Sequence, residues 1–403
     1  MKEPVARSLE YWARVRAREL ALHDGETSLT YREWNEYADM LADAFTGRGL
    51  GFDDVIAVRC SSRIEWAVIA LAAAKIDARL FTLQADLPMR AARQRIIDAH
   101  VSAIIVGDVD PATIAPALEG LPLRLRATLD VLRPGFYNFY DLFPPAAPQR
   151  FSRAQPSLIS WTRGETGKAQ PVGLPRRVAA PASRSRAPMP EQGCSLITVP
   201  LHRVWGPVQF WAALDAGRAI AFMREFDPHL ALQTIERHRV SHWSALPNTL
   251  HQLAALPERT IRAHDLSSMR DLTVGGDAVD YRLKSRLTEL LGPIVNEAYG
   301  STEAGLITFM PARAPLEKPG SCGRPLKGVM VEIRDGRGRR LPPHATGEIW
   351  ARTPRSLSCE LMGPDTRRDA DGFVATADFG RLDEDGFLYI TGRASAQEVR
   401  AAG

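Results

Sequence analysis

Short apolar runs alternate with helical patterns through the first part of the chain, and this alternation leaves few folds open to it. Residues 55–58, 79–83 and 103–106 have the length and composition of buried strands. Apolar residues at helical spacing separate these runs, at 66–74 and 89–99. Strands that alternate with helices in this way form a parallel sheet covered by helices. The pattern therefore predicts a doubly wound α/β subdomain.

A second set of elements follows a stretch, 107–156, that is rich in proline and leucine and that we interpret as a peripheral helix and a connecting loop. The other patterns predict a helix at 9–22, a short strand at 28–31, strands at 157–161, 196–200, 219–222 and 242–247, and helices at 230–238 and 248–256. The predicted fold class is α/β, with two doubly wound mixed or parallel sheet subdomains flanked by helices.

A small β-rich subdomain is expected near the C-terminal end. Apolar runs at 329–333 and 347–351 predict two antiparallel strands, and 335–338 between them carries turn residues. This third subdomain follows the two α/β subdomains in the chain.

The composition is that of a globular protein and argues against several functions. Of 403 residues, 45% are hydrophobic and 24% are charged, with a net charge of +4. The arginines within 176–186 have no interleaved aromatic residues, so we expect a solvated face and no nucleic-acid partner. The cysteines lack the paired spacing of a zinc site or a disulfide framework. Because 1–20 has no signal-peptide pattern and no apolar run approaches about 20 residues, we expect a cytoplasmic protein with no membrane span.

The segment 295–305 combines glycines, hydroxyls, an aromatic ring and carboxylates, and it follows an apolar run, 290–295, that we interpret as a buried strand. Tyr299 offers a flat face for a planar ring, and Gly300 allows a ligand to approach the backbone. Thr302 offers a hydroxyl to an oxyanion, and Glu303 offers a carboxylate to a hard cation such as magnesium. We predict a ligand-binding loop. The alternative is an ordinary turn at a strand end, with its tyrosine in the core.

The run Tyr299-Gly300-Ser301-Thr302-Glu303 resembles the signature of the adenylate-forming enzymes, the superfamily of acyl-CoA and aryl-CoA synthetases, peptide-synthetase adenylation domains and luciferases. Further segments resemble other landmarks of that superfamily in the same order, namely 273–279, 318–325, 375–380, 383–386 and 391–393. The run 238–253 looks closest to fatty-acyl and bulky-acid CoA ligases. The resemblance implies an N-terminal AMP-binding domain over 1–391.

The resemblance also implies a chemistry, in which ATP and a carboxylic acid give an acyl-adenylate and pyrophosphate with the help of magnesium. Thr302 and Glu303 would be catalytic, Thr302 at the α-phosphate and Glu303 at the magnesium ion. Tyr299 would stack on adenine, and Asp378 and Arg393 would hold the ribose. The other nucleotide contacts that it implies are Gly275, Gly276, Asp277, Glu297, Ala298 and Gly300.

The predicted phosphate loop departs from the pattern of the superfamily. The resemblance assigns to it Thr162, Gly164, Thr166, Gly167 and Lys168. Glu165 replaces a small hydroxyl residue, and Gln170 stands where a lysine is usual. A carboxylate close to phosphate oxygens costs roughly 1 to 4 kcal/mol of repulsion. The loop is therefore either altered, with Lys168 and Arg163 reaching the phosphates, or degenerate and no longer used in catalysis.

The segment 200–206 resembles one wall of the acid pocket of these enzymes. His202 would close that wall and take part in catalysis, and Arg203 is a candidate partner for an acidic group of the substrate. The other substrate contacts implied are Trp205, Gly206, Trp243, Gly276, Gly300 and Gly305. A satisfied surface or core histidine, and a core position for either tryptophan, are the alternatives. We expect the substrate to be a medium or bulky apolar carboxylic acid.

In the superfamily a hinge and a mobile C-terminal domain follow the segment that resembles 391–393. Because the sequence ends at Gly403, we expect 392–403 to be a hinge stub and the mobile domain to be missing. Transfer of the acyl group to coenzyme A, or to an acyl carrier protein, would then need another chain. Two functions compete: an acid–CoA ligase that forms an acyl-adenylate, and a catalytically impaired nucleotide- and acyl-binding protein on the same fold. A homodimer is a candidate assembly.

Overall fold

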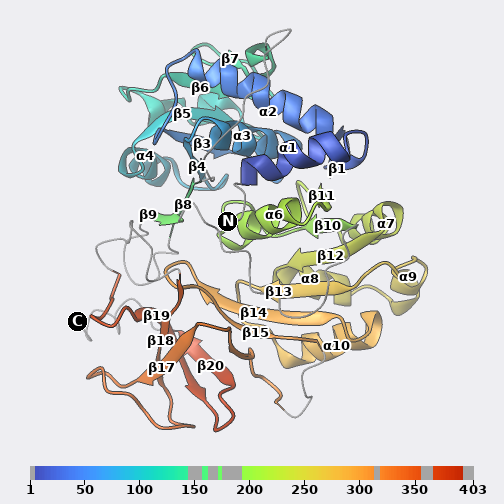
Figure 1. The fold of residues 1–403 in the computed structure, drawn as a ribbon, viewed down its shortest axis with the longest axis vertical. Helices are drawn as coiled ribbons and strands as arrows, with labels where there is room; N and C mark the ends of the chain where they lie inside the picture. The colour runs from blue at the N-terminus through green and yellow to red at the C-terminus, as the bar shows by residue number, and fades with distance from the viewer. Residues whose placement is uncertain are drawn as a thin grey trace.

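The computed structural model describes residues 5–143, 157–161, 171–174, 193–312, 318–354 and 366–393, and within them the strands form three sheets (Figure 1). The first sheet has the order β7 (Tyr137–Asn138), β6 (Leu125–Thr128), β5 (Val101–Val106), β3 (Val55–Arg59), β4 (Arg79–Thr82), β8 (Ser157–Trp161) and β9 (Pro171–Leu174). From β7 to β8 in this order, each strand is parallel to its neighbour, and β9 is antiparallel to β8.

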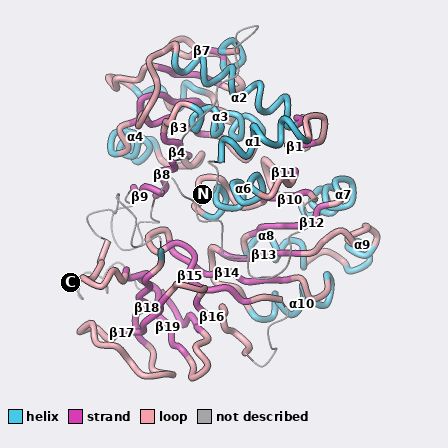
Figure 2. Tube along the Cα trace, in the orientation of Figure 1, coloured by secondary structure: helices cyan, strands magenta, loops and turns pink. Residues whose placement is uncertain are grey.

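The second sheet is mixed and lies beside the first. Its order is β16 (Arg324–Pro325), β15 (Gly305–Met310), β14 (Val295–Ser301), β13 (Asp271–Gly275), β12 (Val240–Ala245), β10 (Cys194–Ile197), β11 (Ala219–Phe222), β1 (Leu20–His23) and β2 (Ser28–Thr30). The third sheet is antiparallel, with the order β17 (Met330–Arg334), β18 (Gly347–Arg352), β19 (Val374–Leu382) and β20 (Leu388–Arg393). Strands and loops make up this third region, at the bottom of Figure 2.

The helices pack in layers on the first two sheets. One apolar core fills the space between these sheets and includes residues of α1 (Val5–Val15), α2 (Tyr31–Thr46), α3 (Ile64–Lys75) and α6 (Trp205–Asp215). A second core covers the outer face of the first sheet with α4 (Met89–Asp98) and α5 (Ala115–Leu118), which follows the 3₁₀ turn η1 (Pro111–Thr113). The 3₁₀ turn η2 (Phe139–Leu142) contributes instead to the core between the two sheets. A third core covers the outer face of the second sheet with α7 (Pro228–His238), α8 (Pro247–Ala254), α9 (Glu258–Arg262) and α10 (Tyr281–Leu291). The order helix, sheet, helix, sheet, helix confirms the predicted fold class.

Most predicted elements are confirmed, and three predictions are wrong in ways that have physical reasons. The helix expected at 9–22 ends at Val15, and Leu20–His23 is instead strand β1 of the second sheet. The strand expected at 290–295 is the end of α10, and the strand β14 begins at Val295. The stretch 107–156 contains two short strands, β6 and β7, that we did not predict. The first two errors concern short apolar runs at the ends of predicted elements, for which periodicity does not separate strand from helix. The strands β6 and β7 have four and two residues, too few for a clear pattern.

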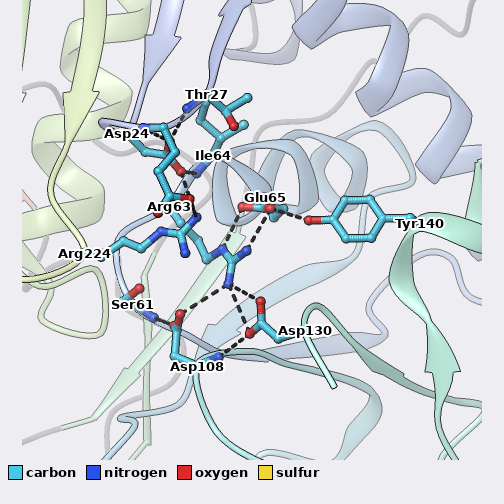
Figure 3. Close-up of polar contacts among 11 residues, drawn as sticks. Asp24, Thr27, Ser61, Arg63, Ile64, Glu65, Asp108, Asp130, Tyr140 and Arg224 are labelled. Atoms are coloured by element: carbon cyan, nitrogen blue, oxygen red, sulfur yellow. Dashed lines mark hydrogen bonds and ion pairs between the residues drawn. The ribbon is translucent and has the colours of Figure 1, made fainter. Parts of the chain in front are cut away.

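A buried arginine organises the carboxyl edge of the first sheet (Figure 3). The side chain of Arg63 is 4% exposed, and its Nε donates to Glu65 over 2.8 Å. Its Nη1 donates to Asp130 over 2.9 Å and to Asp108 over 3.2 Å. Asp108 follows β5, Asp130 follows β6 and Arg63 lies between β3 and α3, so one guanidinium joins three loops of this edge.

The same cluster connects the first sheet to the second. Asp24, which follows β1, accepts a hydrogen bond from the backbone N–H of Ile64, and Arg224, which follows β11, lies 3.7 Å from the Asp24 carboxylate. On the other side, the hydroxyl of Tyr140 donates to Glu65 over 2.6 Å. The relative position of the two sheets at this end therefore depends on a buried network of charges.

We predict that Arg63→Met lowers the free energy of unfolding by about 3 kcal/mol, because it leaves three carboxylates without their buried cation. The measurement is the urea midpoint with its slope. The matched control is Arg133→Met, which removes the cation of an exposed pair with Asp110, in which the arginine side chain is 46% exposed. We expect the control to unfold at the wild-type midpoint. Equal midpoints for the two variants would contradict the organising role of Arg63.

Candidate nucleotide and acid site

Most of the predicted site residues that the structure describes lie at one edge of the second sheet. The strands β10, β12, β13 and β14 are parallel neighbours, so their carboxyl ends meet there. Ligands of open α/β sheets bind outside the carboxyl ends of the strands. The chain places Arg203 after β10, Asp277 after β13 and Thr302 after β14. The structure thus brings together segments from residues 198 to 303.

The signature run is a strand and a tight turn, and the prediction of a loop over all of 295–305 is wrong. Residues Val295–Ser301 are strand β14, which pairs antiparallel with β15. Thr302 and Glu303 form the turn between these strands, and both are partly exposed at its tip. The Ser301 hydroxyl accepts from the backbone N–H of Ala304 over 3.0 Å, which holds the turn.

Gly300 is required by the neighbouring strand. A Cβ at Gly300 would lie 2.3 Å from the carbonyl oxygen of Gly305 and 2.9 Å from the Cα of Leu306. Both atoms belong to backbone that is paired with β14, so they have little freedom to move. The glycine therefore allows close strand contact at the root of the turn that carries Thr302 and Glu303.

Tyr299, Asp378 and Arg393 meet across the boundary between the second and third sheets. The hydroxyl of Tyr299 donates to Asp378 Oδ2 over 2.8 Å, and Arg393 Nη1 lies 3.5 Å from Asp378 Oδ1. Tyr299 and Asp378 are 9% and 6% exposed. Burial and the Asp378 charge raise the pKa of Tyr299, so its phenol stays protonated and donates the hydrogen bond. These contacts bring the predicted adenine contact and the predicted ribose contacts together, and their nucleotide roles stay predictions.

A distortion of β19 presents Asp378. Ala377 has a φ of +61°, in the left-handed region, and the pairing with β18 shifts register at this point. The Thr376 hydroxyl stabilises the distortion, because it donates to the carbonyl of Ile349 over 2.9 Å and accepts from the backbone N–H of Asp378 over 3.2 Å. Bulges of this type commonly aim a side chain next to a functional site.

Glu297 faces helix α10. Its carboxylate lies 3.6 Å from Lys284 Nζ, and its side chain is 12% exposed. Burial raises the pKa of Glu297 to about 7, and the nearby Lys284 ammonium opposes the rise. Burial lowers the pKa of Lys284. The structure therefore gives this predicted nucleotide contact a protein partner, and its nucleotide role stays a prediction.

His202 and Arg203 differ in what they contact. Burial and the charge of Arg203 lower the pKa of His202 to about 4, so His202 is neutral at physiological pH. Arg203 instead donates through Nη1 to Asp277 Oδ2 over 2.9 Å, with side chains that are 38% and 40% exposed. Gly276, just before Asp277, has a φ of +85°, which turns the chain after β13 in a conformation that favours glycine.

The two predicted tryptophans lie in different environments. Trp243 is 1% exposed, stacks on Phe226 and donates from its indole N–H to Thr198 over 3.0 Å, so it occupies the core. Trp205 is partly exposed at the first residue of α6, and its buried indole N–H has no hydrogen-bond partner among the described residues. Gly206 allows close packing, because a Cβ there would lie 2.7 Å from the carbonyl oxygen of Pro200. Trp205 remains a candidate for the acid pocket.

Other predictions fall outside the described residues or concern metals and membranes. The predicted phosphate-loop residues lie outside the described ranges, namely Thr162, Gly164, Thr166, Gly167 and Lys168. The arginines within 176–186 also lie outside them. In the part of the chain that the structure describes, no group of three His, Cys, Asp or Glu residues could hold a metal by itself. Cys60, Cys194 and Cys322 are buried free thiols. No described helix is long and apolar enough to cross a membrane.

Comparison with known proteins identifies the family. The profile of the family described as "AMP-binding enzyme" matches residues 9–359. The chain belongs to this family. This AMP-binding enzyme is 28% identical over 388 residues to the indoleacetate–CoA ligase of Aromatoleum aromaticum, with 93% of this chain and 75% of the relative covered.

Further relatives of this AMP-binding enzyme agree. It is 26% identical to the fatty acid–[acyl-carrier-protein] ligase ScoC of Streptomyces coeruleorubidus, with 92% of this chain and 73% of ScoC covered. The solved structure of the amide bond synthetase McbA from Marinactinospora thermotolerans superposes with a TM-score of 0.83 and 27% identity, covering 97% of this chain and 79% of McbA. These findings confirm the resemblance to adenylate-forming enzymes and the fold of their AMP-binding domain.

Sequence reasoning missed two residues that position the site and one contact between predicted residues. Lys284 pairs with Glu297, and Thr376 holds the distortion before Asp378. Thr376 lies inside the segment 375–380, which resembled a family landmark, and Lys284 lies in no such segment. Arg203 and Asp277 were each predicted as site residues, but their ion pair was not. Pairing between segments separated by more than 70 residues leaves no local pattern.

We predict that Glu297 makes this AMP-binding enzyme less stable as pH rises from about 5 to 7.5. Because its pKa is raised in the folded state to about 7, the stabilising protonated form is fully present below the unfolded pKa near 4.5 and is lost as pH rises through 7. Relative to wild type, Glu297→Gln should gain about 1 to 3 kcal/mol over this interval. The measurement is the urea midpoint at each pH. Glu289→Gln, on the exposed side of α10, the helix that Glu297 faces, should follow the wild type. A parallel profile for both variants would refute the prediction.

Proposed function

We propose that this AMP-binding enzyme uses ATP to convert a carboxylic acid into an acyl-adenylate. A carboxylate oxygen of the acid attacks the α-phosphorus, the bond to the bridging oxygen breaks, and pyrophosphate leaves with the electron pair. The observation that supports this proposal most is the Tyr299–Asp378–Arg393 contact, which joins the predicted adenine ring contact to the predicted ribose contacts. The relatives named as ligases favour this enzyme over a non-catalytic binding protein.

The turn after β14 contacts the phosphate of the nucleotide, and β19 contacts its nucleoside. Thr302 offers its hydroxyl to the α-phosphate oxygens, which carry the growing negative charge of the transition state. Asp378 accepts from the ribose hydroxyls through its carboxylate oxygens, beside Tyr299 and Arg393. The rigid distortion at Ala377 and Thr376 fixes this carboxylate before the nucleotide arrives. The protein therefore contributes mainly by holding reactants in place.

Magnesium fits the residues present. This ion commonly binds through one or two carboxylates together with substrate phosphates, and it keeps several waters. Glu303, partly exposed at the tip of the turn and next to Thr302, supplies one such carboxylate. Magnesium bound there would neutralise charge on the phosphate oxygens. We propose no further protein ligand for it.

For the acid we propose a medium or bulky apolar molecule, and for the acceptor coenzyme A or an acyl carrier protein. Support for the acid comes from Trp205 near the predicted pocket and from relatives named for indoleacetate and for fatty acids. Support for the two acceptors comes from the same two names, one a CoA ligase and the other an acyl-carrier-protein ligase.

The test is pyrophosphate release by the 403-residue chain with ATP and magnesium, against indole-3-acetate, 4-coumarate, 2-succinylbenzoate and decanoate. We expect release that depends on one class of acid. Glu303→Gln should lower kcat by about a hundredfold or more, because the carboxylate proposed to hold magnesium at the phosphate oxygens is lost. Asp378→Asn should raise the KM for ATP by about tenfold, which corresponds to about 1.4 kcal/mol.

The control for both substitutions is Glu289→Gln, which neutralises an exposed carboxylate on α10 and should leave both constants at their wild-type values. Acid-independent release, or equal behaviour of the Asp378 variant and the control, would contradict the proposed function. Calorimetric titration with AMP separates nucleotide binding from adenylation of the acid, since it reports binding without turnover.

A further inference from the structure

Arg203 and Asp277 form an ion pair that spans the site edge of the second sheet. Arg203 belongs to the segment after β10 and Asp277 to the segment after β13, and in the sheet β12 lies between these two strands. Neighbouring strands are about 4.8 Å apart, so the two backbones are separated by roughly twice that distance. The 2.9 Å contact between Nη1 and Oδ2 therefore crosses the carboxyl end of β12.

The exposure of this pair distinguishes it from the buried ion pairs among the described residues, such as those of Arg63. The side chain of Arg63 is 4% exposed and contacts three carboxylates, so it has no accessible alternative partner. The side chains of Arg203 and Asp277 are 38% and 40% exposed. An exposed pair gains little over hydrated separate charges, and a ligand can replace one member at small cost. Arg203 thus has the character of an exchangeable cation.

The neighbouring His202 carries no charge at physiological pH, whereas Arg203 beside it is a cation. Burial, together with Arg203 and Arg95, lowers the pKa of His202, while Asp86 opposes the shift. His202 is consequently neutral at physiological pH and offers no charge to a carboxylate. Arginine is well suited to the task, because its planar guanidinium binds a carboxylate through two parallel hydrogen bonds.

We propose that Arg203 exchanges Asp277 for the carboxylate of the acid substrate, so that Asp277 is a built-in competitor of that substrate. This inference rests on the proposed function and adds to it a residue that lowers affinity for the acid. Without acid, Asp277 holds the guanidinium across β12. With acid, the same guanidinium binds the incoming carboxylate and reduces its repulsion from the phosphate that it attacks.

The experiment compares Asp277→Asn, Arg203→Gln, Arg203→Lys and the double variant Arg203→Gln/Asp277→Asn. The readout is the KM for the acid at saturating ATP, with the KM for ATP measured in parallel. Asp277→Asn should lower the KM for the acid about threefold to tenfold, since the competitor is removed. Arg203→Gln should raise it about tenfold or more and change the KM for ATP less than twofold. Arg203→Lys should fall between Arg203→Gln and wild type, and the double variant should match Arg203→Gln.

The matched control is an exposed pair at the opposite ends of β12 and β13. Arg239 directly precedes β12, Asp265 lies in the segment that leads into β13, and their contact is 3.0 Å with side chains 64% and 49% exposed. Arg239→Gln and Asp265→Asn should leave the KM for the acid unchanged. If Asp277→Asn leaves the KM for the acid unchanged or raises it, the exchange is overturned, even if the wild type is active.

Direct binding separates this inference from the proposed function. Calorimetric titration with indole-3-acetate and decanoate in the absence of ATP should show tighter binding to Asp277→Asn than to wild type, and weaker binding to Arg203→Gln. If the wild type releases no pyrophosphate but this order of affinities holds, the adenylation proposal fails and the exchange stands. Equal affinities in wild type and both variants, or no binding to any of them, would overturn the exchange.

Discussion

The hydrogen bond between Tyr299 and Asp378 is the contact on which the site depends. It joins residues that are 79 positions apart and belong to different sheets. The signature strand β14 carries Tyr299 and leads to the Thr302–Glu303 turn, whereas Asp378 lies on the third sheet with Arg393 beside it. Both side chains are more than nine-tenths buried, so the bond is shielded from competing water. Because a nucleotide here would contact both sheets, the distance between its ring and ribose contacts is set by this one bond.

The parts of the fold that the sequence predicts are those with a local pattern. Buried strands such as β3, β5 and β11 consist largely of apolar residues, and the helix predicted at 66–74 lies within α3, so both kinds of element were recognisable. The assignment of strands to sheets was less accessible. Strand β1 joins the second sheet through β11, almost 200 residues later, and no local pattern reports that pairing. Short strands such as β7 contain two residues, which is below the length at which alternation can be detected.

The candidate site shows the same division between local and distant information. The signature run and the segment around Asp378 marked residues that the structure brings into contact. The glycine of the signature, however, suggested a loop open to a ligand, and the structure shows that Gly300 is needed because the backbone of β15 passes so close. Likewise, Trp243 is of a residue type that often lines pockets. In the structure it lies in the core, where it stacks on Phe226 and its indole N–H donates a hydrogen bond to Thr198. Residue type alone does not separate a ring that binds a ligand from one that fills a core.

The charged residues make this limit clearest, because their roles depend on burial. Lys75 has a fully buried side chain that contacts Asp39 over 2.8 Å and Glu10 over 3.3 Å, and Arg63 is almost as inaccessible. Separating such pairs would leave uncompensated charge in a medium of low dielectric, so they hold helices and sheets in one arrangement. The pair of Arg203 and Asp277 is chemically similar but remains in contact with solvent, where its separation costs little. A rigid frame built on the first kind of pair can therefore hold the second kind at the site edge, where a change of partner leaves the fold undisturbed.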